Sequence, residues 1–164
     1  MAGQFSTIGG TARTNVARLN LDGTVDPSFN PVANGPVRAI LSQRDNRIVL
    51  GGDFTTLQPG GTGAATARNR LARLNADGSL DTAFNPNVGG QLQPQVHALM
   101  LQADNRIVAG GSFTTVQPNG AATATTRNYL ARFNADGSLD ATFNPNPKSP
   151  IIVNFKTRMN NYDL

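Results

Sequence analysis

The chain has 164 residues, enough for one domain with a hydrophobic core. Its hydrophobic content is 38% and its charged content only 15%, while Gly (17) and Pro (10) are frequent, as in proteins built from many short strands and turns. Glu is absent and Lys occurs only at Lys148 and Lys156, although helical proteins normally use both on exposed faces. These features exclude a largely helical protein and predict an all-β fold.

The composition also excludes several classes of site and partner. Cysteine is absent, so the chain has no disulfide and no thiolate metal site. The net charge is +4, but the Arg residues are spread along the chain and are not interleaved with aromatic residues, so we expect no nucleic-acid binding. No apolar run approaches the length of a membrane span, and residues 1–10 lack the basic start and apolar stretch of a signal peptide.

Internal repeats organise the chain. Three segments that end in Phe-Asn-Pro align without gaps, at residues 11–31, 66–86 and 125–145. Residues 36–59 match residues 95–118, whereas residues 2–10 match only the second half of that stretch. We therefore divide a single domain, 1–164, into a partial unit 1 (2–35), a full unit 2 (36–94), a full unit 3 (95–149) and a tail (150–164).

Each full unit is predicted to hold four short antiparallel strands. In unit 2 the first strand, 37–43, alternates apolar and polar residues, and the second, 47–56, contains a Gly pair that indicates a bulge or the close approach of another backbone. A third strand, 68–75, and a short fourth strand or edge segment, 80–86, flank an Asp-Gly turn. Four such strands in each repeat predict a β-propeller blade.

The repeated sequence resembles the delta-60 repeat, a bacterial family regarded as β-propeller-like. The pieces that carry the resemblance are DNRIV-x-GG-x-FTT, RN-x-LAR-x-N and DGSLD-x-x-FNP, and the match covers residues 2–146. The resemblance implies a propeller fold and a place in large bacterial surface or secreted proteins, so we expect an extracellular or cell-surface location. It implies no established reaction and no catalytic residues.

The sequence of the tail, residues 150–164, predicts how the blades form a closed ring. Residues 150–164 align with residues 36–50, and Ile151, Val153 and Phe155 keep the apolar alternation of a strand. One chain would then hold about three blades' worth of strands, and two chains would complete each other's split blade in a six-bladed homodimeric ring. Two alternatives stay open: the tail is unrelated sequence, or the chain is a piece of a longer array.

A repeated N-x-D-G-x-x-D motif raises the question of calcium, which takes six to eight oxygen ligands from side chains and carbonyls. The EF-hand pattern is not met, because it needs a Glu at its twelfth position and the chain has none. The candidate calcium ligands are Asn20, Asp22, Asp26, Asn75, Asp77, Asp81, Asn134, Asp136 and Asp140.

The favoured interpretation of this motif is a hairpin turn whose Asp residues pair with Arg. Each unit carries two Arg at fixed places, at Arg13 and Arg18, Arg68 and Arg73, and Arg127 and Arg132. Six Arg thus recur in step with six Asp, which predicts bidentate contacts between neighbouring strands or blades. Calcium remains the alternative.

The sequence offers little support for catalysis. His97 is the only histidine and is expected to be an exposed strand residue, so no Ser–His–Asp arrangement can be assembled around it. GGTGAAT (60–66) lacks the Lys-Ser/Thr ending of a phosphate loop. The variable polar loops, 57–67 and 116–126, are better candidates for binding a protein or a glycan.

We therefore expect a non-enzymatic propeller that serves as a scaffold or interaction module and assembles with itself, without a cofactor. Two alternatives stay open: a calcium-dependent adhesive or glycan-binding module, and a fragment of a carbohydrate-active propeller enzyme that uses Asp.

Overall fold

The computed structural model describes residues 1–91 and 93–149. The tail, with its predicted strand, lies outside the described residues. Within them the fold is all-β, with strands, turns and two short 3-10 segments, Pro59–Gly61 and Pro118–Gly120. No helix in this part of the chain is long and apolar enough to cross a membrane.

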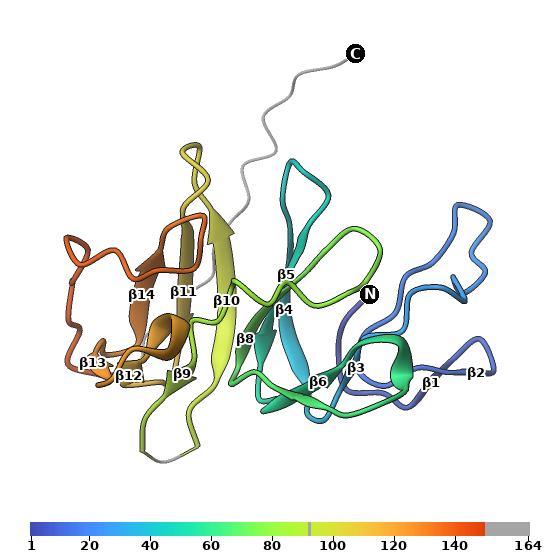
Figure 1. Ribbon diagram of the computed structural model, residues 1–164, viewed down its shortest axis with the longest axis horizontal. Helices are drawn as coiled ribbons and strands as arrows, with labels where there is room; N and C mark the ends of the chain where they lie inside the picture. The colour runs from blue at the N-terminus through green and yellow to red at the C-terminus, as the bar shows by residue number, and fades with distance from the viewer. Residues whose placement is uncertain (92, 150–164) are drawn as a thin grey trace.

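Two three-stranded antiparallel sheets form the centre of the molecule, and they stand side by side (Figure 1). In unit 2 the order is β4 (Val37–Ser42), β5 (Ile48–Gly52) and β8 (Leu71–Leu74). Unit 3 repeats this arrangement with β10 (Val96–Leu101), β11 (Ile107–Gly111) and β14 (Leu130–Phe133). The two sheets have the same register, since Leu50 faces Ala72 as Ala109 faces Ala131.

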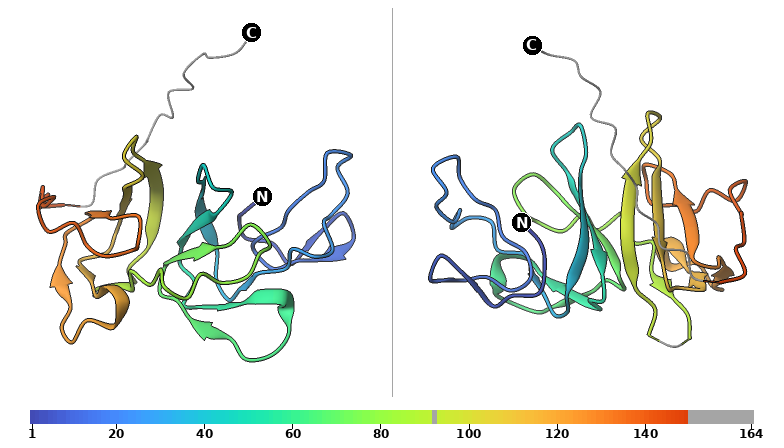
Figure 2. Two further views of the ribbon diagram at one scale, coloured as in Figure 1. Left: turned by 45° about the horizontal axis from the view of Figure 1, so that its top comes forward. Right: turned by 180° about the vertical axis from the view of Figure 1, so that it is seen from behind.

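Smaller sheets lie beside these two and connect the units. The strand β3 (Val32–Ala33) comes from unit 1 but pairs with β6 (Thr56–Gln58) of unit 2, which also pairs with β7 (Thr66–Ala67). Likewise β9 (Val88–Gly89) of unit 2 joins β12 (Thr115–Val116) and β13 (Thr125–Thr126) of unit 3. The other two strands of unit 1, β1 (Thr7–Ile8) and β2 (Thr11–Ala12), pair with each other at one end of the row of units (Figure 2).

The predicted four strands per blade are not all formed. The segment 80–86 makes only a single bridge, Leu74 to Leu80, and unit 3 repeats it between Phe133 and Leu139. The predicted strand 47–56 is divided into β5 and β6, because the chain leaves one sheet after Gly52 and enters another at Thr56. The large sheets therefore have three strands, with a short bridge where the fourth was expected.

The apolar pattern explains the first two strands of each large sheet. In β4, Val37, Ala39 and Leu41 are less exposed than the residues between them, as expected for a strand with one packed face. The central strand β5 is almost wholly buried, because it has a neighbour on each side and packed faces. The predicted bulge is present: the β4–β5 register shifts between Val37 and Ala39, where the Gly52 backbone lies against Pro36 and Val37.

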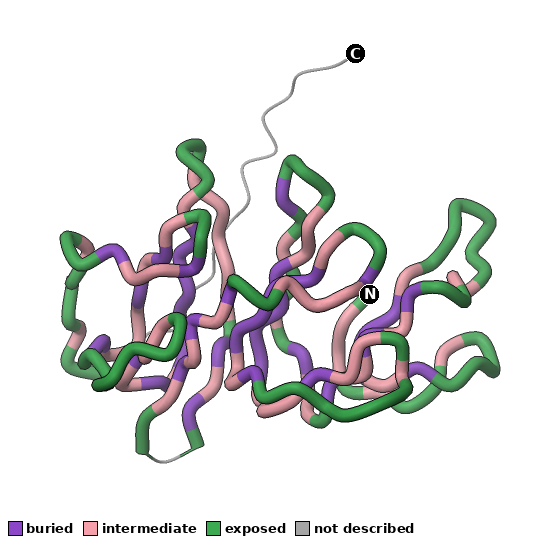
Figure 3. The backbone as a smooth tube through the Cα atoms, in the orientation of Figure 1, coloured by how far each residue is buried: buried purple, intermediate pink, exposed green. Residues whose placement is uncertain are grey.

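In the part of the chain that the structure describes, the hydrophobic core consists of two clusters, and each draws on consecutive units. One contains Phe29 and Ala33 of unit 1 together with Leu50, Phe54 and other apolar residues of unit 2. The second contains Phe84 and Val88 of unit 2 together with unit 3 residues such as Phe113 and Phe133. In Figure 3 the buried chain follows the central strands and the turns are exposed. Each unit thus completes the core of the unit that follows it.

Candidate functional site

The Asp-Gly motif of each unit forms a turn closed by its own side chains. In unit 2 the Asn75 amide N–H donates to the Ser79 carbonyl at 2.8 Å, and the Gly78 N–H donates to the Asn75 carbonyl at 3.0 Å. The Asp77 carboxylate accepts from both the amide (2.9 Å) and the hydroxyl (2.7 Å) of Ser79, whose oxygen also accepts from the Asn75 side chain (2.9 Å). Units 1 and 3 repeat these contacts, so the motif is a self-contained turn in this structure.

The second Asp of the motif belongs to a contact between units. Both Nε and Nη2 of Arg73 lie 2.8 Å from Oδ2 of Asp81, and the guanidinium lies 4.3 Å from the centre of the Phe84 ring. The Nη1 of Arg73 donates to the carbonyl of Ala135, in the Asp-Gly turn of unit 3, at 2.5 Å. One Arg therefore binds a carboxylate and an aromatic ring of its own unit and the backbone of the next unit.

Unit 1 makes the same joint with unit 2. Arg18 pairs with Asp26 at 2.8 Å, covers the Phe29 ring at 4.5 Å, and donates to the carbonyl of Ala76 at 2.5 Å. The first unit's Arg is more exposed, with 35% of its side chain accessible against 3% for Arg73. The joint thus occurs twice within the described residues, at two levels of burial.

The carboxylates of these joints are stabilised in the ionised form. The hydroxyl and amide of Ser28, with Arg18, lower the pKa of Asp26 to about 2. The hydroxyl of Thr142 has the largest effect on Asp140, and with the Thr142 amide and Arg132 it lowers that pKa to about 2. For Asp81 burial is the largest single influence and raises the pKa, but Arg73, the Ala83 amide and Arg47 together outweigh it and the pKa is lowered.

The predicted pairing of Arg with Asp is confirmed for half of the residues. Arg18, Arg73 and Arg132 pair with Asp26, Asp81 and Asp140. Arg73 and Arg132 place two nitrogens on one oxygen instead of forming a bidentate fork, and Arg18 places its Nε there. The other three Arg use backbone carbonyls: Arg68 donates to Ala67 at 2.7 Å and to Thr82 at 3.2 Å, as Arg13 and Arg127 do at matching places. These Arg hold the chain after the Asp-Gly turn within its own unit.

The nine candidate calcium ligands are therefore divided between two kinds of contact. The six from Asn20, Asp22 and their counterparts close the turns, and the three at Asp26, Asp81 and Asp140 face guanidinium groups. Among residues 1–91 and 93–149, no three His, Asp or Glu side chains gather closely enough to hold a metal ion. Calcium binding stays a prediction.

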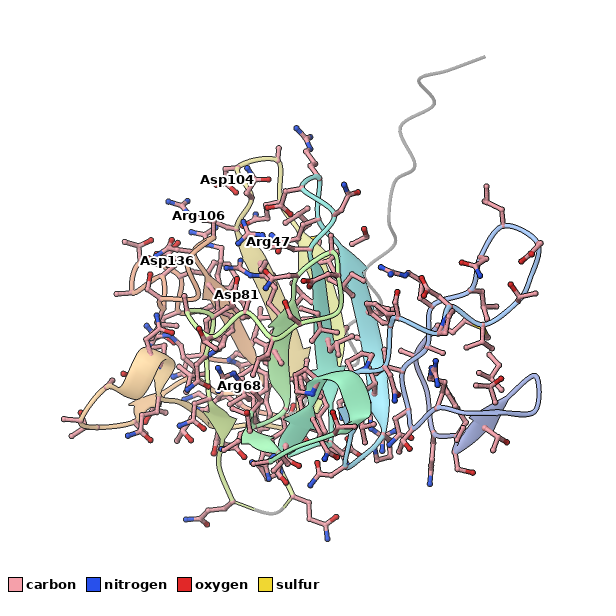
Figure 4. The ribbon with its side chains drawn as sticks, turned by 45° about the vertical axis from the view of Figure 1, so that its right-hand side comes forward. Arg47, Arg68, Asp81, Asp104, Arg106 and Asp136 are labelled. Atoms are coloured by element: carbon pink, nitrogen blue, oxygen red, sulfur yellow. The ribbon has the colours of Figure 1, made fainter. Side chains whose placement is uncertain are left out.

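A second set of charged contacts lies at the turn between the first two strands, and the sequence analysis missed it. Arg47 pairs with Asp45 at 2.5 Å and also reaches Asp81 at 3.3 Å, and Arg106 pairs with Asp104 at 3.2 Å. Figure 4 shows Arg47, Asp104 and Arg106 on the same side of the molecule, with Asp81 beneath. The repeated DNR sequence carried the signal, since its Asp and Arg recur together.

A shallow depression lies between these turns, lined by Gln43, Arg44, Asp45, Arg47, Asn105 and Ala135. Most of the residues that line it are polar, but it brings no nucleophile beside a general base. His97 is exposed in β10, where the sequence predicted it. Residues 60–66 begin inside the 3-10 segment Pro59–Gly61 and end in β7, so they do not open the helix that a phosphate loop needs.

The repeated sheets and the joints between them define a propeller-type repeat protein. A comparison with family models agrees with this class: the model described as a domain of unknown function (DUF5122) beta-propeller matches residues 1–29, 43–84 and 102–143. The chain belongs to this β-propeller family. No curated protein and no solved structure matched the chain.

Proposed function

We propose that the chain is a non-enzymatic scaffold and interaction module that assembles with itself into a closed ring, with two copies giving six blades. The delta-60 resemblance adds the expectation that it works at the surface of a bacterium or outside it. The observation that carries the proposal is the use of the recurring charged residues. The Arg73–Asp81 pair, the Phe84 ring and the Ala135 carbonyl form one joint, so these groups are engaged in holding units together.

The same contacts support the proposal that the chain catalyses no reaction. A carboxylate that acts as a general acid needs a raised pKa, but Asp26 and Asp140 have a pKa of about 2 and Asp81 has a lowered one. These residues also recur with the repeat, whereas an enzyme site usually breaks repeat symmetry. A screen against a broad set of glycans should show no turnover, and turnover lost in a single Asp→Ala variant would contradict the proposal.

The partner-binding surface is assigned to the loops 57–67 and 116–126. Both are polar and largely exposed after a short paired strand, and they differ in sequence between units that are otherwise alike. A rigid sheet that holds variable loops is a common arrangement for recognition of proteins and glycans. Exchange of the two loops between units should change the partner without changing the fold.

Self-assembly is tested by the mass in solution. A chain of 17.3 kDa that forms the proposed ring should elute with twice that mass in size-exclusion chromatography with light scattering. The measurement is repeated over a range of concentrations, because the proposed dimer should dissociate on dilution. A folded chain that stays at its own mass at the highest soluble concentration would overturn self-assembly.

A calcium-dependent adhesive module is the second candidate, and the Asn and Asp side chains gathered in each turn favour it. Since a ligand that binds only the folded state must raise stability, the melting temperature separates the two functions. We expect the same melting temperature in calcium and in chelator, because the turn oxygens already accept hydrogen bonds from Ser79 and its counterparts. An increase in calcium that is absent in magnesium would favour the adhesive module.

A further inference from the structure

Each internal joint consists of a short extended segment of one unit placed on the next. Three alternate residues of this linking segment are buried: Phe29, Pro31 and Ala33 in unit 1, and Phe84, Pro86 and Val88 in unit 2. The Phe covers the Gly of the next unit's Asp-Gly turn so closely that a Cβ on Gly78 would lie 2.8 Å from the Phe29 ring, and one on Gly137 would lie 2.9 Å from Phe84. The end of the segment adds a strand to the next unit's small sheet.

Unit 3 carries a third linking segment, residues 143–147, which is held in place but is less buried than the other two. Asn146 has φ 46°, as Asn87 has φ 47°, and both accept a 2.7 Å hydrogen bond from the side chain of an equivalent Asn in their own unit. In contrast to Phe84 and Pro86, the matching Phe143 is half-buried and Pro145 is exposed. Among residues 1–91 and 93–149, the segment therefore has the shape of a joint but no following unit to bury it.

Unit 1 shows the opposite half of the joint. The residues that receive a linking segment in unit 2 are Leu57, Leu74 and Gly78, all buried. Their counterparts Ile8, Leu19 and Gly23, which we call the acceptor face, are exposed or half-buried, with Leu19 37% exposed against 0% for Leu74. A Cβ on Gly23 would meet nothing within 4 Å. Within the described residues β1 pairs only with β2, whereas β6 pairs with β3 as well as with β7.

Within the described residues, Arg132 lacks the contact with a following unit that Arg18 and Arg73 make. Like Arg18 and Arg73, it pairs with its own Asp and covers its own Phe, with the guanidinium 4.6 Å from the Phe143 ring. The other two Arg use Nη1 for the carbonyl of the next unit's turn, but Arg132 directs it to Gln102 of its own unit at 3.4 Å. This contact is long for a hydrogen bond, so the guanidinium can exchange Gln102 for a better acceptor.

We propose that the linking segment 143–147 of one copy docks on the acceptor face of a second copy of this chain, in the geometry of the internal joints. Phe143 then covers Gly23, Arg132 donates to the carbonyl of Leu21, and Pro147 lies opposite Ile8 beside the free edge of β1. The contact is head-to-tail, so it closes when the last copy meets the first. This inference rests on the proposed self-assembly and names the surfaces that perform it.

A disulfide between two copies tests the register. Val88 and Val116 are directly opposite in the β9–β12 ladder, and Pro147 and Ile8 are their counterparts in the sequence alignment. Opposite residues of an antiparallel pair have Cα atoms about 4.5–5.5 Å apart, within the reach of a disulfide. Because the chain has no cysteine, Ile8→Cys and Pro147→Cys variants of different mass can be mixed, oxidised and separated on a non-reducing gel.

We expect a mixed disulfide from Ile8→Cys with Pro147→Cys, several times stronger than from Thr11→Cys with Pro147→Cys. Thr11 is exposed on β2, one strand further from the proposed contact, so it serves as the matched control. Circular dichroism on each variant confirms that the comparison is made between folded chains. Equal yields from the two mixtures would overturn the proposed register.

A second variant blocks the acceptor face without a change in the linking segment. Gly23→Asn keeps a residue type that tolerates the positive φ of 84°, and its side chain would occupy the place of Phe143. Gly63→Asn is the control, because Gly63 has φ 77° and an equally open surrounding but lies in the loop of unit 2. We expect Gly23→Asn to reduce the mass in solution to that of one chain and Gly63→Asn to leave it unchanged.

The results separate this inference from the proposed function. A dimer that persists in Gly23→Asn and gives no specific disulfide would overturn the docking surfaces and leave self-assembly intact. A chain that is monomeric at every concentration would overturn both. Masses above a dimer, with the specific disulfide, would support the docking surfaces but contradict a ring of two copies.

Discussion

Arg73 is the residue on which the joint between units 2 and 3 depends most. Its side chain is 3% exposed and contacts Asp81, the Phe84 ring and the carbonyl of Ala135. Removal of such a side chain leaves a partly buried carboxylate without its main partner, which costs more than the pair itself contributes. Arg18 makes the same contacts at 35% exposure, so water can replace more of them.

We therefore expect Arg73→Ala to lower the free energy of unfolding by about 3 kcal/mol, and Arg18→Ala by less than about 1 kcal/mol. Urea unfolding of the two variants measures both values. Arg73→Lys should recover only part of the loss, since an ammonium cannot place donors on both Asp81 and the Ala135 carbonyl in the same plane. Equal losses for Arg73→Ala and Arg18→Ala would show that burial of the joint does not determine its contribution.

The lowered pKa of Asp140 makes the stability of the chain depend on pH under acidic conditions. Its pKa of about 2, and that of Asp26, lie below the ordinary value of 3.8, so the ionised form is favoured in the folded chain. The stability that they contribute is complete above about pH 4 and is lost as the pH falls through about 2. We expect the urea midpoint to fall across this interval.

Asp140→Asn is the matching variant for the acid dependence. It should unfold at lower urea than the wild type at pH 7, and the difference should shrink toward pH 2, where the wild-type carboxylate is itself protonated. A difference that stays constant over this range would mean that the charge of Asp140 does not stabilise the fold.

At the scale of the element, the bulge of β4 and β5 explains why Gly52 is required. A Cβ at this position would collide with the backbone of Pro36 and Val37, which cannot move without opening the sheet. The unit 1 counterpart is Gly3, where the described residues leave more room: the nearest atom to a Cβ there would be in the Phe5 ring, at 3.5 Å. The same residue type is thus under different constraints at equivalent places.

We expect Gly52→Ala to destabilise the chain by about 1–3 kcal/mol through the steric clash. Gly3→Ala should be neutral or stabilise it by up to about 1 kcal/mol, because Ala lowers the entropy of the unfolded chain. Thermal unfolding of both variants at one pH provides the comparison. A neutral Gly52→Ala would show that the bulge is more adaptable than its contacts indicate.

The strands that could be predicted from the sequence are those whose pattern is local. The alternation in residues 37–43 predicted β4, and the Asp-Asn and Asp-Gly turns were placed correctly because those residues tolerate left-handed backbone: Asn46 has φ 63° and Gly78 φ 88°. The fourth strand predicted at residues 80–86 forms only a single bridge, and its last residues belong to the linking segment. Pairing between units depends on long-range contacts, which a local pattern does not specify.

The candidate site was predictable only in part for the same reason. The recurrence of Arg with Asp indicated pairing, and three of the six pairs are present. Which Arg of each unit pairs with Asp depends on where the chain turns back, since Arg68 reaches Thr82 while Arg73 reaches Asp81. The stacking of Arg73 on Phe84 was missed, although the Phe recurs at a fixed distance from the Arg.

At the scale of the whole molecule, stability is expected to be lowest at the unit 1 end. The hairpin of β1 and β2 has exposed or half-exposed residues, while β5 and β11 are central strands with almost every residue buried. Amide exchange follows the free energy of local opening, so amides of the hairpin should exchange much faster than those of the central strands. Hydrogen–deuterium exchange with mass spectrometry on peptic fragments measures this gradient.

Exchange also reports on assembly, because the edge of β1 is the surface that a second copy is proposed to cover. Dilution should therefore increase exchange at Thr7 and Ile8, with little change at Ile107 in β11. An effect of dilution that is equal in β1 and β11, or protection of β1 that does not depend on concentration, would contradict this expectation.

The linking segment also has a genetic consequence. Because a unit carries its Phe-Asn-Pro segment at its end and its Asp-Gly turn before it, one tandem duplication copies both halves of a joint together. The new copy can receive the segment before it and offer its own segment to the unit after it, with no further substitution. A gene built in this way can change its number of units by recombination while every junction keeps the same chemistry.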